Sequence, residues 1–144
     1  GLKMGTVVFI GAGPGAADLI TVRGARRLAQ ADVVLFDALT DPALRELAPQ
    51  ATWIDVGKRG FGHATGQAAI NALLVQAACD HARVVRLKGG DPSIFGRLEE
   101  EMAALQQAGI AYEVVPGVSS FCGAAAALRQ EYTLPGISQS VVIA

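Results

Sequence analysis

The sequence has little cysteine, little aromatic content and no long apolar run. Its two cysteines, Cys79 and Cys122, stand in no CxxC spacing and near no histidine pair, so no zinc site is predicted. No run of about 18 or more apolar residues predicts a transmembrane helix, and residues 1–4 lack the features of a signal peptide. We therefore expect reduced thiols in a cytoplasmic protein that has no membrane partner.

The chain also lacks an excess of either charge. Twelve Lys and Arg residues face thirteen Asp and Glu residues, and the formal net charge is −1. A dedicated nucleic-acid binder would need a basic surface, so a nucleic-acid partner is disfavoured. With 144 residues, 51% of them hydrophobic, the chain can bury one core, and a single domain is predicted.

Short apolar runs rich in β-branched residues alternate with stretches of helical spacing. The predicted strands are Thr6–Ile10, Asp32–Phe36, Thr52–Val56, Arg83–Leu87 and Ala111–Val115. The predicted helices are Val22–Gln30 after a cap at Thr21, one with Ile70, Leu73, Leu74 and Ala77 on one face, and Leu98–Ala108 before a stop at Gly109. The alternation predicts an α/β fold with a mostly parallel five-stranded sheet and helices on both faces. The alanine run 124–127 predicts a further helix packed closely on the sheet.

Glycine-rich segments directly follow three of the predicted strands. They are Gly11–Gly15, Gly89–Pro92 and Pro116–Ser120. Right-handed crossovers place the carboxyl ends of parallel strands at one edge, where open α/β sheets bind ligands. Glycines allow a backbone to turn tightly and to approach a ligand closely. Three such loops on one edge therefore predict a ligand site.

A dinucleotide site is one alternative for the first loop. Gly11–Ala16 fits the pattern GxGxxG/A, and Asp37 ends the next strand, where a ribose-binding acid would lie. This would indicate a nicotinamide-dependent oxidoreductase. Against it, Pro14–Asp18 has the composition of an irregular loop and the helix cap is delayed to Thr21, so pyrophosphate could not lie directly on the helix end.

The segment Arg86–Arg97 is the most unusual in the chain, because charges, glycines and a proline directly follow a buried strand. Asp91 could accept hydrogen bonds from ribose hydroxyls or a cationic amine. Gly89 and Gly90 leave room for a flat nucleoside, and Ile94 could line an adenine slot. A plain loop would not need all of these residues.

Five motifs, taken in order, resemble the tetrapyrrole (corrin/porphyrin) methylase family, and within it the uroporphyrinogen-III C-methyltransferases. They are GAGPG, the strand end Phe36-Asp37, Val56-Gly57-Lys58-Arg59, VVRLKGGDPxIFGR and VVPGVSS. The likeness runs from Val7 to about Ala127, and the GGDPxIFGR part is specific to the family.

The resemblance implies S-adenosylmethionine as co-substrate, no metal, and methylation of uroporphyrinogen III to precorrin-2 in sirohaem and cobalamin synthesis. A precorrin methyltransferase acting later in that synthesis is the alternative within the family. The family's cofactor contacts fall on Pro14, Gly89, Gly90, Asp91, Ile94, Ser119 and Ser120. Its proton acceptor falls on Asp37 and its proton donor on Lys58.

A uroporphyrinogen substrate carries many carboxylates, and basic residues near the site suit it. Lys58, Arg59, His63 and Arg97 could form its electrostatic receptor, with arginine suited to a bidentate grip. Two purely structural alternatives stay open: Lys58 could pair with a surface carboxylate, and Asp37 could be a turn residue.

The sequence departs from the family in three places. Leu98-Glu99 replaces the glycines that usually follow IFGR, and Tyr132–Gly136 replaces the family's PLTHR. The third departure is the family's second domain, which we expect to be missing from this sequence. Residues 1–137 are predicted to form the amino-terminal domain, with 138–144 as the linker and first strand of a missing carboxy-terminal domain. We expect this fragment to be inactive alone and its parent to be a homodimer.

Overall fold

The computed structural model describes residues 3–37, 41–57, 66–93 and 97–129. These residues form a five-stranded, all-parallel sheet with the strand order β3-β2-β4-β1-β5. The strands are β1 (Thr6–Gly11), β2 (Val33–Phe36), β3 (Thr52–Asp55), β4 (Arg83–Lys88) and β5 (Tyr112–Val115). Each lies within one residue of its predicted bounds, and the predicted fold class is confirmed. No helix in the described ranges is long and apolar enough to cross a membrane.

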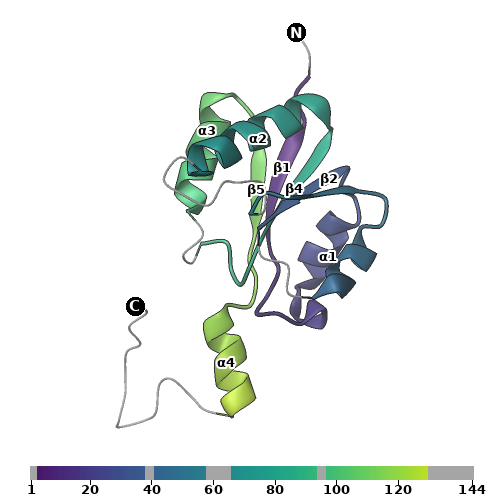
Figure 1. Ribbon diagram of the computed structural model, residues 1–144, viewed down its shortest axis with the longest axis vertical. Helices are drawn as coiled ribbons and strands as arrows, with labels where there is room; N and C mark the ends of the chain where they lie inside the picture. The colour runs from purple at the N-terminus through teal and green to yellow at the C-terminus, as the bar shows by residue number, and fades with distance from the viewer. Residues whose placement is uncertain (1–2, 38–40, 58–65, 94–96, 130–144) are drawn as a thin grey trace.

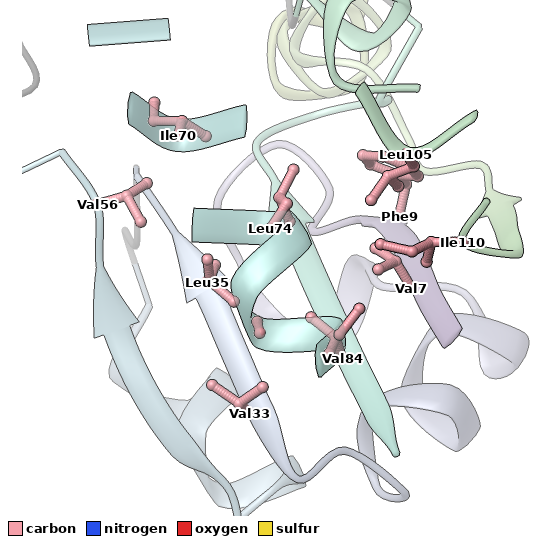
Figure 2. Close-up of a cluster of buried hydrophobic side chains, with 12 residues drawn as sticks. Val7, Phe9, Val33, Leu35, Val56, Ile70, Leu74, Val84, Leu105 and Ile110 are labelled. Atoms are coloured by element: carbon pink, nitrogen blue, oxygen red, sulfur yellow. The ribbon is translucent and has the colours of Figure 1, made fainter. Parts of the chain in front are cut away.

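Helices cover both faces of the sheet, as predicted (Figure 1). On one face, α2 (Gly66–Asp80) and α3 (Leu98–Gln107) pack over a cluster of apolar side chains that includes Phe9, Leu74 and Leu105 (Figure 2). On the other face, α1 (Val22–Leu28) and the 3₁₀ helix η2 (Pro42–Leu47) cover a second cluster. Because both faces are buried, β2 and β4 are almost continuously buried.

The helix boundaries follow from local chemistry that the sequence shows. The Thr21 hydroxyl accepts a hydrogen bond from Gly24 N at 3.0 Å and caps α1. Gly109 adopts a φ of +73° just after α3, which confirms the predicted stop. A short 3₁₀ turn, η1 (Ala17–Leu19), separates the first glycine loop from α1, as the irregular-loop interpretation requires.

The alanine-rich segment forms a helix, α4 (Ser120–Leu128), but its predicted packing on the sheet is wrong. Within the described residues, α4 projects beyond the carboxyl edge of the sheet (Figure 1), and Ala126 and Ala127 are exposed. Its close contact is with the first glycine loop, since a Cβ on Gly123 would lie 2.5 Å from Pro14 Cβ. The small residues of α4 therefore allow it to pack closely against the first glycine loop, and not against the sheet.

Candidate cofactor and active site

The three glycine-rich loops meet at the carboxyl edge of the sheet, as the topology predicts. Gly13 and Gly90 form an isolated antiparallel bridge, with Gly90 N donating to Gly13 O at 2.9 Å and Gly13 N to Gly90 O at 3.2 Å. A Cβ on Gly117 would lie 2.4 Å from Gly90 O and 2.8 Å from Gly11 Cα. The loops therefore pack backbone against backbone at a distance that only glycine permits.

Gly89 differs from these neighbours. It is exposed, and a Cβ built on it would have no heavy atom within 4 Å. Packing therefore does not require glycine here, whereas the φ of +63° at Gly90 does favour it. The absence of a side chain at Gly89 keeps the surface beside the loops open.

Asp91 joins the second loop to the third. Its Oδ1 accepts from Gly117 N at 3.0 Å, and its Oδ2 accepts from Ser93 N at 3.0 Å and from the Ser93 hydroxyl. Partial burial alone would raise the pKa of Asp91, but these hydrogen bonds outweigh it and the pKa lies below its ordinary value. Both oxygens thus stabilise the loops, and the predicted ribose contact stays a prediction.

The third loop leads into α4 through a serine cap. The Ser119 hydroxyl accepts from Cys122 N at 3.3 Å, and its side chain is almost buried. Ser120 is the first residue of α4. Together with Pro14, which contacts Gly123, these serines border the same loop cluster. The structure thus gathers Pro14, Gly89, Gly90, Asp91 and the two serines at one edge.

Asp37 follows β2 at this same edge. Phe36 lies opposite Leu87 in the sheet, so Asp37 adjoins the end of β4, where Lys88 precedes Gly89. The Asp37 side chain is 41% exposed, and its Oδ2 accepts from Arg86 Nη2 at 3.2 Å. This arrangement places a half-exposed carboxylate next to the glycine loops.

Arg86 belongs to a buried ion network that the sequence analysis missed. Its Nε donates to Glu101 Oε1 at 2.7 Å, and Lys88 Nζ donates to Glu101 Oε2 at 2.5 Å. Arg86, Lys88 and Glu101 are 1%, 4% and 0% exposed. Arg86 and Lys88 are separated by one residue, so their side chains point to the same face of β4, which is apolar apart from these two residues and the exposed Arg83 at its start. That pattern was the available signal for a buried anion.

The network changes the proton affinity of both cations. Burial alone would lower the pKa of Arg86, but the carboxylates of Glu101 and Asp37 outweigh it and the pKa lies above its ordinary value. Burial, and then the charge of Arg86, lowers the pKa of Lys88.

The other predicted site residues are less informative. Arg97 has a left-handed φ of 54°, and its exposed guanidinium pairs with Glu100 at 3.0 Å. Leu98, which departs from the family pattern, begins α3 directly and packs against the core. The predicted roles of Lys58, Arg59, His63 and Ile94, the Tyr132–Gly136 departure and the boundary at 137/138 fall outside the described residues.

Other chemistry-bearing features lie apart from this edge. Cys79 and Cys122 are free and exposed, and no cluster that could hold a metal ion occurs in the part of the chain that the structure describes. A hollow of about 370 Å³ lies near the starts of β1, β4 and β5, beside Arg27 and Glu113. It contains none of the predicted site residues.

Comparisons with known proteins show which proteins this chain resembles. The family model for Tetrapyrrole (Corrin/Porphyrin) Methylases matches residues 6–144. The siroheme synthase of Zymomonas mobilis subsp. mobilis is 47% identical over 97% of this chain and 30% of that protein. The uroporphyrinogen-III C-methyltransferase of Bacillus subtilis is 51% identical over 83% of this chain and 25% of that protein. The chain thus spans less than a third of the length of either relative.

Two solved structures share the fold. The Thermus thermophilus uroporphyrin-III C-methyltransferase, complexed with S-adenyl homocysteine, has a TM-score of 0.73 and 43% identity, covering 83% of this chain and 51% of that one. A cobalt precorrin-4 methyltransferase has a TM-score of 0.82 and 37% identity, covering 95% and 56%.

Proposed function

Because the chain belongs to the tetrapyrrole (corrin/porphyrin) methylase family, we propose that it carries the cofactor loops and proton acceptor of an S-adenosylmethionine-dependent methyltransferase. The observation that carries this proposal is the meeting of three glycine-rich loops beside the half-exposed Asp37. The glycines of the loops allow the cofactor to lie close to the backbone, and Asp37 places a carboxylate at the same edge of the sheet.

The loop cluster fits an adenosyl group. Gly89 leaves open surface, and the backbone around Gly90 and Gly117 is held rigidly by packing and by Asp91. S-adenosylmethionine, when bound, supplies a methyl group on a positively charged sulfur. The residues that would hold it are Pro14, Gly89, Gly90, Asp91, Ile94, Ser119 and Ser120. The relative solved with S-adenyl homocysteine supports this choice of cofactor.

Asp37 is the proposed proton acceptor. Attack of a pyrrole carbon on the sulfonium methyl forms the new C–C bond and leaves the tetrapyrrole cationic, so this intermediate must then lose a proton, and a half-exposed carboxylate can take it. Holding the two reactants in line supplies much of the rate, so a strongly perturbed base is unnecessary. Lys58 is the proposed proton donor.

The proposed reaction is C-methylation of uroporphyrinogen III to precorrin-2. The Bacillus subtilis relative supports that substrate, and Arg59, His63 and Arg97 would meet its carboxylates. A precorrin methyltransferase acting later in the same synthesis is the second candidate, supported by the TM-score of 0.82 to the cobalt precorrin-4 enzyme. The proposal includes a cytoplasmic homodimer, to be checked by light scattering.

A nicotinamide-dependent oxidoreductase is disfavoured. The 3₁₀ turn Ala17–Leu19 separates the first glycine loop from α1, whose first turn is capped by Thr21. Pyrophosphate on the glycines would therefore not reach the end of α1. Calorimetric titration of the chain with S-adenosylhomocysteine and with NADH separates the two, and we expect heat only with the first.

The decisive experiment uses a protein of the relatives' full length that contains this chain. It is incubated without oxygen with uroporphyrinogen III and S-adenosylmethionine carrying a labelled methyl group. We expect a doubly labelled product, and its much slower formation in Asp37→Asn with cofactor binding retained. Binding without transfer would favour the later precorrin substrate. Neither binding nor transfer would contradict the proposal.

A further inference from the structure

The buried ion network ends at Asp37, and the proposed chemistry does not by itself require it. Arg86 is 1% exposed and lies between Glu101, which is fully buried, and Asp37, whose side chain is 41% exposed. The network therefore runs from beneath α3 to the surface of the candidate site.

Stability alone gives little reason for such a network. Burying ions costs solvation energy, and well-packed apolar residues of similar volume often stabilise a fold at least as well. The neighbouring side chains on this face of the sheet are apolar, for example Phe9 and Val84, and so is Leu105 of α3, which packs over them (Figure 2). Charges at positions 86 and 88 thus call for a role besides packing.

The geometry of Arg86 suggests that role. Its Nε donates to Glu101 Oε1 at 2.7 Å, its Nη1 to Leu87 O at 3.3 Å and its Nη2 to Asp37 Oδ2 at 3.2 Å. Because the guanidinium is planar, the bond to Glu101 also fixes the direction of Nη2. Lys88 holds the other oxygen of Glu101, so Glu101 is itself held in place.

We propose that Arg86, fixed from behind by Glu101, is the positioning residue that holds the Asp37 carboxylate beside the cofactor loops. Arg86 lies on β4, and that strand runs directly into Gly89 and Gly90. The same strand therefore sets the place of the carboxylate and of the second loop. This inference rests on the proposed function, in which Asp37 accepts the proton.

The test uses Arg86→Met in a protein of the relatives' full length that contains this chain. Methionine keeps much of the side-chain volume and leaves Glu101 paired with Lys88, but it removes the donor to Asp37. We expect kcat for methyl transfer to fall about 10- to 100-fold, the scale that a small misplacement of a reacting group produces. The KM for S-adenosylmethionine should stay unchanged. Arg86→Lys, which keeps the charge, should recover part of the loss.

A double variant separates positioning from a general structural effect. In an Asp37→Asn background, Arg86→Met should lower kcat little further, because the group that it positions is already gone. Arg27→Met removes an exposed ion pair between α1 and β5 and is the matched control, with kcat expected to be unchanged. If Arg86→Met does not fold, Arg86→Lys is compared in the two backgrounds instead.

The outcomes are distinguishable. If Asp37→Asn lowers kcat strongly and Arg86→Met lowers it by the same factor in both backgrounds, or not at all, the positioning role is overturned and the proposed function stands. If Asp37→Asn leaves kcat unchanged, the proton-acceptor role fails, and the positioning role fails with it.

Discussion

An arginine–glutamate ion pair lies near each end of the parallel strands, and the two pairs differ in burial. At the carboxyl edge, Arg86 and Lys88 share the fully buried Glu101. Near the starting ends of the strands, Arg27 pairs with Glu113 at 2.8 Å, and both side chains are more than a third exposed. Water can replace either partner at the exposed pair, whereas only the fold satisfies the buried one. We therefore expect the stability of the fold to depend on the buried ion pair much more than on the exposed one.

The largest expected effect comes from removing the shared anion. Glu101→Ala removes the buried carboxylate that Arg86 and Lys88 share, and we expect it to lower the free energy of unfolding by about 3–5 kcal/mol. Glu113→Ala, which breaks the exposed pair, should change it little. Urea unfolding followed by circular dichroism measures both. Equal losses in the two variants would contradict the contrast between the edges.

A second pair of variants tests the glycine loops. Gly117→Ala would place a Cβ 2.4 Å from Gly90 O, so we expect the backbone clash to cost about 1–3 kcal/mol of stability. Gly89→Ala meets no atom within 4 Å and should leave stability nearly unchanged while lowering the affinity for S-adenosylhomocysteine. Thermal unfolding and calorimetry separate the two effects. Unchanged affinity in Gly89→Ala would remove this residue from the cofactor site.

The smallest expected effect is on the pH dependence of stability in acid, through Asp91. Because the pKa of Asp91 is lowered in the fold, its ionised form stabilises the fold above the unfolded value of about 3.9, and this contribution is lost as the pH falls through the folded pKa. Asp91→Asn should therefore reduce stability at pH 7 and make the loss below about pH 4 shallower. Urea midpoints from pH 7 to about pH 3 measure this. An unaltered pH dependence would contradict the role of Asp91 in joining the loops.

Local sequence signals predicted most of the fold. The strands were predictable because β-branched runs such as Arg83–Leu87 are buried on both faces and bounded by turn residues. The meeting of the three glycine loops was predictable because parallel strands end at one edge. The cap at Thr21 and the stop at Gly109 depend only on neighbouring residues.

Features that depend on contacts between distant residues were not predictable. The pairing of Arg86 with Glu101 requires a particular rotation of α3, which periodicity does not determine. The hydrogen bond from Gly117 N to Asp91 Oδ1 depends on how two loops approach one another. The position of α4 depends on the direction in which the chain leaves β5. The alanine-rich composition therefore predicted that a helix forms, but it did not predict where the helix lies.

The most direct test of the central claim is nuclear magnetic resonance of the isotopically labelled 144-residue chain titrated with S-adenosylhomocysteine, since chemical shifts report weak binding residue by residue. We expect the amide signals of Gly13, Gly89 and Gly117 to move with ligand and those of Arg27 and Glu113 to stay in place. Shifts confined to the Arg27 and Glu113 end, or no shifts at saturating ligand, would contradict the central claim.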